Sequence, residues 1–434
     1  MPVLIRGGRL IDPAAGIDGR RDVLLSEGRV SAVALPGELD GPAREQNAEV
    51  FDATGLVVST GLVDIHVHLR EPGQGYKETI SSGTAAAAAG GFTSVCAMPN
   101  TIPVNDSVGI TRWMQDAERS ASARVFPIAA ATVGSMGERL TDYKSLHAAG
   151  AVAVSDDGKP ILEENIMRQA LATAARVGLP VIQHAEDTRL TGGCSMNAGA
   201  LAFRLGLRGM TSEAEWGLVE RDIRLLAELN TKDAHLHVAH LSTAAALEAV
   251  RRAREQGLHV TCEVAPHHFL LTEEAVSGYD TNAKMNPPLR SEADREAMIA
   301  GIFDGTVDCI ATDHAPHAAH EKEQEFERAP NGITGLETAL GLCLSLLHKR
   351  HGLSLSRVIE LLSARPAAVL RLQGRGRLAA GDFADVMIFD PHIEWPFCAA
   401  NSKSKSKNTP FDGWLMGGRV RATISEGRFV YRAE

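Results

Sequence analysis

The feature that most constrains the fold is the alternation, through the middle of the chain, of short apolar strands with amphipathic stretches of helical length. The predicted strands lie at residues 63–66, 93–98, 125–129, 151–155, 181–184, 236–240, 260–264 and 309–312. Helical patterns such as those at 164–177, 213–229 and 243–256 lie between most of them. This alternation predicts an α/β fold with a parallel sheet, and eight strands within roughly 250 residues match a (β/α)8 TIM barrel. An open doubly wound sheet is the alternative, and it is disfavoured because no GxGxxG motif opens a helix after an early strand.

The two ends of the chain have a different pattern, in which short apolar runs are separated by turn residues. Residues 2–56 carry apolar runs at 3–5, 23–25 and 30–33, with turn signals at 7–8, 12–13 and 27–28. The C-terminal region repeats the pattern at 383–390 and 420–431. Because chain termini often lie close together, we expect residues 1–56 and 375–434 to form one composite β-sandwich domain beside a barrel at 57–374.

The composition excludes several classes of protein. The chain of 434 residues has 44 Lys+Arg against 54 Asp+Glu and a formal net charge of -10, so we expect no nucleic-acid partner. The alternating serines and lysines at 402–407 are expected to form a solvated loop. The 6 cysteines form no CxxC pair, which disfavours a disulfide framework or a thiolate zinc site. No apolar run reaches the ~18 residues of a membrane span, and no signal-peptide pattern is present, so we expect a soluble cytoplasmic protein with no membrane partner.

Histidine and aspartate residues recur at the ends of the predicted strands. His66 and His68 lie two residues apart on the first strand, so both imidazoles point to one face. The fourth, fifth, sixth and eighth strands end at Asp156-Asp157, His184, His240 and Asp313. The carboxyl ends of barrel strands meet at one rim, where barrel enzymes bind their substrates. Four histidines and two carboxylates at this rim would form a nitrogen and oxygen site suited to Zn²⁺, with two ions if one carboxylate bridges them.

Some of these residues also have a simpler interpretation when taken alone. Asp157 precedes a glycine and could form an Asp-Gly turn, and Asp313 could cap a helix or a turn. The metal interpretation therefore depends on the coincidence of such residues at five strand ends. Strand parity does not decide between Asp156 and Asp157.

Several segments resemble the amidohydrolase superfamily and, within it, the dihydroorotase family. They are GLVDIHVHLREPG at 61–73, AMPNT at 97–101, SDDG at 155–158, KMNPPLR at 284–290, ATDHAPH at 311–317 and KSKNTPF at 405–411. The resemblance extends over essentially the whole chain and points to the longer bacterial type, which is similar to the dihydroorotase domain of the animal multifunctional pyrimidine enzyme. It implies a zinc-dependent cyclic amidohydrolase of de novo pyrimidine (UMP) biosynthesis, which closes N-carbamoyl-L-aspartate reversibly to L-dihydroorotate.

The resemblance also implies roles for individual residues at the metal centre. One zinc ion would be held by His66, His68 and Asp313, the second by His184 and His240, and Asp157 would bridge the two. Asp157 rather than Asp156 matches the family's spacing to His184. A hydroxide bridging the metals would attack the ring carbonyl, with Asp313 as the general base and acid.

Residues that bind the small-molecule substrate are implied in the same way. Arg70 would hold the substrate carboxylate in a bidentate contact. Asn100 and His317 would add further contacts, and Asn286 would help to hold the ring. The segment 315–332, with its Pro, Asn and Gly residues, is expected to be a mobile loop that could close as a lid on the substrate.

Two other functions share parts of the pattern. A hydantoinase or allantoinase is disfavoured by Arg70, by Asn100 and by the lack of a bridging lysine, since Lys159 lies beyond the turn. A non-catalytic scaffold for aspartate transcarbamoylase is disfavoured because all six ligand positions are filled. A homodimer, and an association of the active enzyme with aspartate transcarbamoylase, are both compatible with the resemblance.

Overall fold

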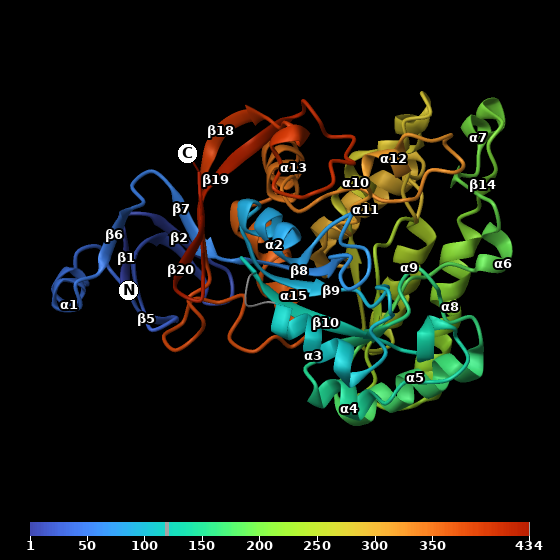
Figure 1. Ribbon diagram of the computed structural model, residues 1–434, viewed down its shortest axis with the longest axis horizontal. Coiled ribbons are helices and arrows are strands. Elements are labelled where there is room, and N and C mark those ends of the chain that lie inside the picture. The colour runs from blue at the N-terminus through green and yellow to red at the C-terminus, as the bar shows by residue number, and fades with distance from the viewer. Residues whose placement is uncertain (118–120, 434) are drawn as a thin grey trace.

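The structure is a computed structural model that describes residues 1–117 and 121–433 (Figure 1). Its centre is an eight-stranded sheet of order β17-β16-β15-β12-β11-β10-β9-β8, in which all neighbouring strands are parallel. The strands are β8 (Leu62–Val67), β9 (Phe92–Ala97), β10 (Arg124–Ala130), β11 (Ala153–Ser155), β12 (Val181–Gln183), β15 (Leu236–Val238), β16 (Val260–Val264) and β17 (Cys309–Ile310). The chain after β17 returns to β8, because His314 forms a parallel bridge with Val67 and His68 N donates to His314 O at 2.9 Å. The sheet is therefore a nearly closed barrel, and the predicted (β/α)8 TIM barrel is confirmed.

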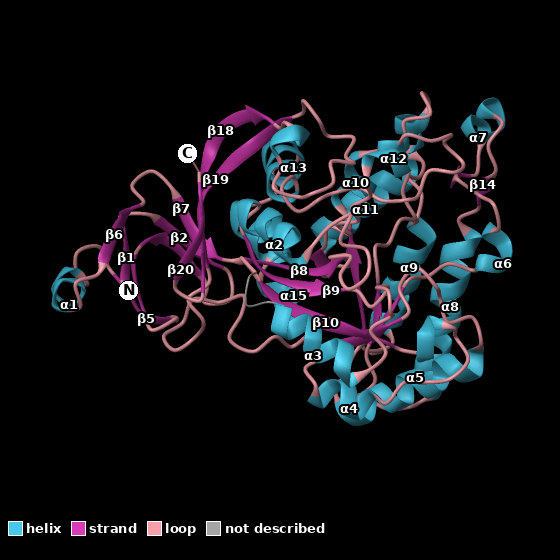
Figure 2. Ribbon diagram, in the orientation of Figure 1, coloured by secondary structure: helices cyan, strands magenta, loops and turns pink. Residues whose placement is uncertain are grey.

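Helices cover the outside of this barrel (Figure 2). They include α2 (Ile80–Ala89), α3 (Val108–Ala117), α4 (Tyr143–Ala148), α5 (Glu164–Val177), α8 (Glu213–Glu228), α9 (Ala244–Glu255), α11 (Glu292–Asp304) and α14 (Leu355–Leu362). In α5 the buried side chains of Met167, Ala170, Leu171 and Ala174 recur at the spacing of one helical face. Strands β8 and β9 are buried throughout, as expected for parallel strands covered on both faces.

One end of the barrel is closed by apolar packing. Ala367 and Val369 of α15 (Ala364–Val369) belong to the same buried cluster as the barrel residues Ile65 and Ile182. Arg365 Nε donates to the Asp308 carbonyl, directly before β17 begins, so α15 lies at the amino end of the strands. The predicted site residues all lie at the opposite, carboxyl end.

The two ends of the chain form two further sheets. Their N-terminal strands are β1 (Val3–Arg6), β2 (Arg9–Asp12), β3 (Ile17–Arg20), β4 (Asp22–Ser26), β5 (Arg29–Ala34), β6 (Glu49–Asp52) and β7 (Val57–Thr60). The C-terminal strands are β18 (Val386–Pro396), β19 (Leu415–Ser425) and β20 (Arg428–Arg432). One sheet has the order β5-β4-β1-β6, and the other, β20-β19-β18-β7-β2-β3, joins strands from both ends of the chain, which lie side by side in Figure 1.

An apolar core connects these two sheets. It includes Val3 and Ile5 of β1, Val58 of β7, and Ile388 and Ile424 of the C-terminal strands. Within the larger sheet, Val58 lies opposite Ile388. The predicted β-rich domain is therefore confirmed. The domain limits at 1–56, 57–374 and 375–434 stay a prediction.

The Ser-Lys segment at 402–407 differs from the solvated loop that we expected. Its lysines are exposed, but Ser404 and Ser406 are buried. The Ser404 hydroxyl donates to Glu78, and the Ser406 hydroxyl donates to the Lys77 carbonyl at 2.6 Å. Because serine and lysine alternate strictly, Ser404 and Ser406 face the protein interior and the lysines face the solvent. The expectation was right for the lysines only.

The segment 315–332 is tied to the barrel by Lys284 and is held together internally by Lys322. It contains α12 (Ala319–Lys322). Lys284 Nζ donates to the carbonyls of Phe326, Glu327 and Ala329, and Lys322 Nζ donates to those of Pro330 and Gly332. The structure shows one conformation of this segment, and its closure on a substrate stays a prediction.

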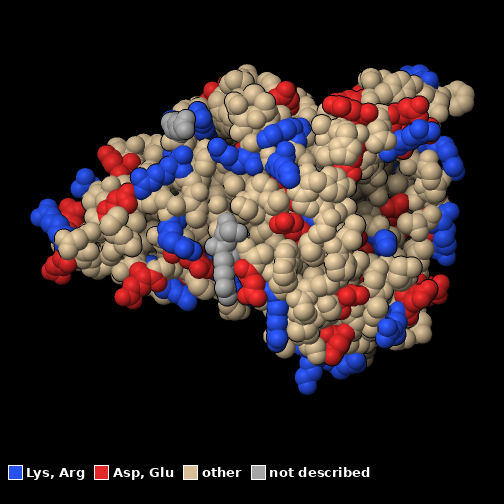
Figure 3. Space-filling model, viewed as in Figure 1, with Lys and Arg blue, Asp and Glu red and all other residues tan. Residues whose placement is uncertain are grey.

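The surface mixes charges of both signs. Figure 3 shows Lys and Arg interspersed with Asp and Glu over the face that it presents. Among the residues that the structure describes, no helix is both long enough and apolar enough to cross a membrane.

Candidate metal centre

The six predicted ligands meet at the carboxyl end of the barrel. His66 is the second-last residue of β8, and His68 follows directly after this strand. The other four ligands lie after β11, β12, β15 and β17. All six side chains are buried. Their donor atoms form three overlapping groups whose members all lie within 4.8 Å of one another, namely His66, His68 and Asp157; His66, His240 and Asp313; and Asp157, His184 and His240.

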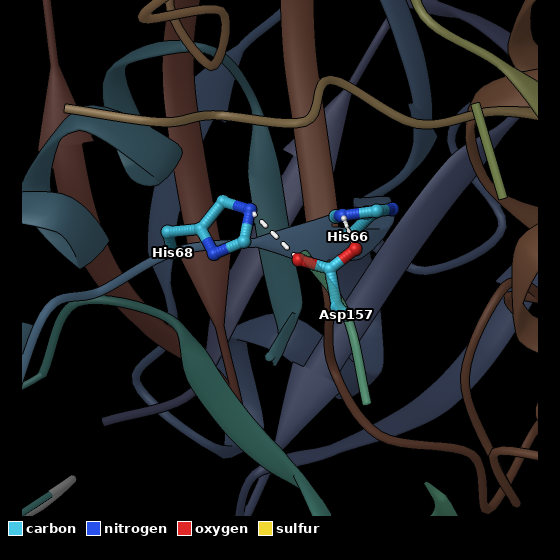
Figure 4. Close-up of side chains that lie close together, drawn as sticks. All are labelled: His66, His68 and Asp157. Carbon is cyan, nitrogen blue, oxygen red and sulfur yellow. Dashed lines mark ion pairs between the residues drawn. The ribbon is translucent and has the colours of Figure 1, made fainter. Parts of the chain in front are cut away.

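Asp157 lies at the middle of this cluster (Figure 4). Its Oδ1 lies 3.5 Å from His66 Nε2, and its Oδ2 lies 3.6 Å from His68 Nε2. Its Oδ1 is also 3.7 Å from His184 Nδ1 and 3.8 Å from His240 Nε2. A carboxylate that faces all four histidines is placed as a ligand bridging two ions would be.

Asp156, the alternative to Asp157, is engaged elsewhere. Its Oδ1 accepts a hydrogen bond from Thr132 N at 2.9 Å, and its Oδ2 accepts one from the Thr132 hydroxyl. Asp156 belongs to none of the three donor groups. The geometry of the described residues therefore favours Asp157.

The electrostatics of the cluster suit a cation. Three of its buried atoms, His66 Nε2, Asp157 Oδ1 and His240 Nδ1, have no hydrogen-bonding partner among the described residues. Burial opposes ionisation of Asp157, but the charge of His66 and the close approach of the His240 and His66 imidazoles lower its pKa well below the usual value. Burial likewise opposes ionisation of Asp313, and the charge of His66 and a hydrogen bond from His68 lower its pKa. Ionised carboxylates and imidazole nitrogens are the forms that bind metal ions, so the donor set fits Zn²⁺.

Three of the four imidazoles are oriented by a second contact. His66 Nδ1 donates to Glu263 Oε1 at 2.6 Å, His68 Nδ1 to Asn100 Oδ1 at 2.9 Å, and His184 Nε2 to Glu186 Oε2 at 3.0 Å. Each contact leaves the other ring nitrogen facing the cluster. The sequence reasoning missed Glu263 and Glu186. The available signals were a carboxylate inside the apolar strand VTCEV and a second one just after His184.

Three of the predicted site residues have a left-handed backbone conformation that is rare outside glycine. The φ angles are 63° at Arg70, 30° at His240 and 47° at Asp313. Such conformations cost on the order of 1–3 kcal/mol each and persist where the surrounding structure fixes them, typically at functional sites.

Arg70 and His317 lie together beside the cluster. Arg70 Nε donates to the Pro316 carbonyl at 3.0 Å, and a terminal guanidinium nitrogen lies 3.3 Å from His317 Nε2. Burial lowers the pKa of Arg70 to about 10, so the side chain stays cationic at neutral pH. Among the described residues no carboxylate forms an ion pair with it. A buried, unpaired guanidinium is suited to bind an anion.

Lys77 joins this group, and the sequence reasoning did not identify it. Its Nζ lies 2.9 Å from Glu321 Oε1 and 3.4 Å from His317 Nδ1. His317 Nε2 donates to the Asn331 carbonyl at 2.9 Å, so Nδ1 is free to accept from Lys77. Burial, together with the charges of Arg70 and Lys77, lowers the pKa of His317 to about 2, and the ring is neutral.

The two predicted asparagines contact Asp157 and Glu186 rather than Arg70. Asn100 Nδ2 donates to Asp157 Oδ2 at 3.2 Å. Asn286 Nδ2 donates to Glu186 Oε2 at 2.8 Å, and its buried Oδ1 has no partner in the described part of the chain. The structure thus brings all ten predicted residues to one end of the barrel, and their roles stay predictions.

Two family models match the chain, and solved structures share its fold. The model described as Dihydro-orotase-like matches residues 55–246, and the Amidohydrolase family model matches residues 304–431. The dihydropyrimidinase from Brevibacillus agri NCHU1002 superposes with a TM-score of 0.84 at 23% identity, covering 100% of this chain and 95% of that chain. The L-hydantoinase from Arthrobacter aurescens has a TM-score of 0.86 at 24% identity, covering 99% and 96%. At this identity the likeness shows the fold alone.

Sequence relatives of much higher identity carry a single name. The dihydroorotases of Citrifermentans bemidjiense and Geobacter sp. (strain M21) are each 50% identical to this chain over 434 residues, which is 100% of both chains. The dihydroorotase of Solibacter usitatus is 49% identical over 428 residues, or 98% of this chain and 97% of that one. Such identity over the full length shows that the chain belongs to the dihydroorotase family of amidohydrolases.

Proposed function

We propose that this chain catalyses the reversible conversion of N-carbamoyl-L-aspartate to L-dihydroorotate in de novo pyrimidine biosynthesis. The observation that carries the proposal is the cluster of four histidines and two aspartates with the unpaired Arg70 beside it. In the hydrolytic direction, the reaction needs an activated water, a proton acceptor and a cation for the substrate carboxylate. The relatives that are 50% identical over the full length support the same activity.

The proposed cofactor is Zn²⁺, with two ions per subunit. His66, His68 and Asp313 would hold one ion, His184 and His240 the other, and Asp157 would contact both. When bound, zinc lowers the pKa of a water and polarises the carbonyl that is attacked. The protein's contribution is to hold the imidazoles in fixed orientations through Glu263, Asn100 and Glu186.

Asp313 is the proposed general base and general acid. Its carboxylate is held ionised, so it can accept the proton of the attacking water. The same carboxyl then donates that proton to the ring nitrogen that leaves. Its strained φ of 47° fixes the direction in which the side chain points.

Arg70 is the proposed carboxylate-binding residue. Because no carboxylate among the described residues pairs with its guanidinium, the substrate would supply the missing negative charge. His317, Asn100 and Asn286 are the proposed additional contacts to the substrate.

Hydrolysis of dihydroorotate by the purified, zinc-loaded protein tests the proposal. We expect the wild type to hydrolyse dihydroorotate and not hydantoin. Asp313→Asn should lower kcat by ~10²–10⁴-fold, because a positioned proton acceptor contributes about that much. The exposed Asp52→Asn is the control and should keep full activity. A fully active Asp313→Asn would contradict the role of this residue, and activity on hydantoin alone would contradict the substrate.

We separately propose that the protein forms a homodimer, associates with aspartate transcarbamoylase and lies in the cytoplasm. A metal-free chain that binds aspartate transcarbamoylase would favour the scaffold role over catalysis. A homodimer is tested by analytical ultracentrifugation of the purified chain. Association with aspartate transcarbamoylase is tested by co-purification, and a cytoplasmic location by cell fractionation.

A further inference from the structure

A chain of polar side chains runs through the barrel interior from the metal centre toward the amino end of the strands. The interior of such a barrel is normally filled by branched apolar residues. Here His237 of β15 pairs in register with Ile182 on one side and with Thr261 of β16 on the other. His237 and Glu263 are 0% and 1% exposed, so both polar groups are kept at a cost in desolvation. The proposed function uses Glu263 to orient His66 but assigns no role to His237.

Hydrogen bonds link these residues into one continuous chain. Glu263 Oε1 lies 2.6 Å from His66 Nδ1, and Glu263 Oε2 lies 3.2 Å from His237 Nε2. His237 Nδ1 lies 2.8 Å from the Thr261 hydroxyl, which lies 2.7 Å from His235 Nε2. Glu263 Oε1 also accepts from the backbone N of His240 at 3.3 Å.

The direction of each hydrogen bond follows from the nitrogen groups that surround the Glu263 carboxylate. Each of its oxygens faces an imidazole nitrogen, and Oε1 also accepts from the backbone N–H of His240. An ionised carboxylate only accepts hydrogen bonds, so His66 Nδ1 and His237 Nε2 both donate to it. With its Nε2 proton donated to Glu263, His237 accepts from the Thr261 hydroxyl at Nδ1, and Thr261 accepts from His235 Nε2.

His235, the last residue of this hydrogen-bonded series, agrees with this direction. His235 Nδ1 is buried and has no partner among the described residues, as expected for a nitrogen without a proton. Burial lowers the pKa of His235 to about 2, so its ring is neutral. The opposite direction would require a protonated His237 and would leave a buried N–H on His235 without an acceptor, which is unfavourable.

The hydrogen-bonded residues around His237 do not form a third cation site. The ligand atoms of His237, Glu263 and Cys309 also lie within 4.8 Å of one another. However, both ring nitrogens of His237 and both oxygens of Glu263 are already hydrogen-bonded. Burial also raises the pKa of the Cys309 thiol well above its usual value, so no thiolate is available.

We infer that His237 is a positioning residue for the metal centre and acts by holding Glu263 in place. One carboxylate fixes the imidazole of His66 and the backbone of His240, which come from the two proposed zinc sites. The contact with His240 N also helps to hold the φ of 30° at that residue. The inference depends on the proposed metal centre but not on the identity of the substrate.

Zinc affinity of the full-length protein tests the inference, with Zn²⁺ titrated against a chromophoric chelator after metal removal. Glu263→Gln keeps the shape and removes the charge, and we expect zinc to bind ~10–100-fold more weakly, as when the carboxylate behind a metal-binding histidine is lost. His237→Leu removes the donor that holds Glu263 and should weaken binding by about tenfold. His235→Leu is the matched control, because it changes a buried histidine of the same face whose ring hydrogen-bonds to Thr261 and stacks on His259 but does not contact Glu263. Its zinc affinity should stay within about twofold of the wild type.

Several results would overturn the inference. One is an unchanged zinc affinity in Glu263→Gln. Another is an equal loss in His237→Leu and His235→Leu, which would indicate general weakening of the barrel. If Glu263→Gln does not fold, the comparison of the two histidine variants decides. Nitrogen NMR of the zinc-loaded protein should also find His237 neutral with its proton on Nε2. An imidazolium at His237 would contradict the proposed direction of the hydrogen bonds.

The inference and the proposed function fail in different ways. A wild type with no affinity for zinc would overturn the metal centre and the inference together. A wild type that binds zinc with the expected ratios among variants but does not hydrolyse dihydroorotate would overturn the proposed function alone.

Discussion

Arg70 is the residue on which recognition of the substrate should depend most. Its guanidinium uses Nε to donate to the Pro316 carbonyl, which leaves the terminal nitrogens for a carboxylate. We predict that Arg70→Lys raises KM for dihydroorotate by ~10–100-fold, because an ammonium cannot make both contacts at once. Steady-state kinetics measure this change. The control is Arg295→Lys on α11. This arginine pairs with Glu292 of the same helix and is not one of the predicted site residues. An unchanged KM in Arg70→Lys would assign the carboxylate to another residue.

The six metal-binding candidates could be found in the sequence because each one lies at the end of a strand or just after it. A buried apolar run ends, a His or Asp comes next, and the parallel fold brings those positions to one rim. Glu263 could not be found in this way, because it lies inside β16, and the sequence does not show that His66 lies opposite it. Lys77 was missed for a related reason. Its contact with His317 joins residues 240 positions apart, and nothing in the local pattern indicates that contact.

Helix ends are the elements whose contributions can be tested most simply. The Ser354 side chain caps α14 by accepting from Arg357 N at 3.1 Å, and it is exposed. We predict that Ser354→Ala lowers the free energy of unfolding by about 1 kcal/mol, because one N–H of the first turn loses its acceptor. Ser354→Asp should keep the wild-type stability. Urea unfolding of both variants measures the effect, and equal stabilities would exclude a capping contribution.

The segment 315–332 should make stability depend on pH through Lys322. Burial, and then the charge of Lys284, lower the pKa of Lys322 from 10.5 to about 7. Between these values the unfolded chain binds a proton that the folded chain lacks, so the free energy of unfolding rises with pH in this window. Below about pH 7 both states bind the proton, and the destabilising effect of the buried charge is complete.

Lys322→Met should remove this dependence. We predict that, from about pH 7 to pH 9, the wild type gains on the order of 1–3 kcal/mol of unfolding free energy relative to the variant. Urea unfolding at several pH values measures the difference, and the exposed Lys403→Met serves as the control. A difference between wild type and Lys322→Met that stays constant with pH would show that Lys322 is protonated in the folded state throughout.

At the scale of the whole molecule, the pairing of the two chain ends was accessible to sequence reasoning only in outline. Both ends show strand and turn patterns, and this was enough to expect one β-rich unit. The register was not accessible, because it depends on contacts such as Val58 opposite Ile388, which are 330 residues apart. The buried serines of 402–407 show the same limit. Their partners, Glu78 and the Lys77 carbonyl, lie on the barrel loop after β8.

Ile388 tests whether the β-rich unit supports stability without taking part in the chemistry. Its side chain is 0% exposed and lies in the core shared by strands from both chain ends. We predict that Ile388→Ala lowers the free energy of unfolding by about 2–5 kcal/mol, because a buried cavity is created where the two ends meet. The kcat of the folded variant should stay unchanged, since β18 supplies none of the residues of the metal centre. Leu415→Ala on β19 is the control, because that side chain is 64% exposed and should change stability by no more than about 0.5 kcal/mol. A lower kcat in a fully folded Ile388→Ala would instead mean that the packing of the chain ends reaches the metal centre, and the 402–407 segment, which contacts Lys77 and Glu78, would be the connection to examine first.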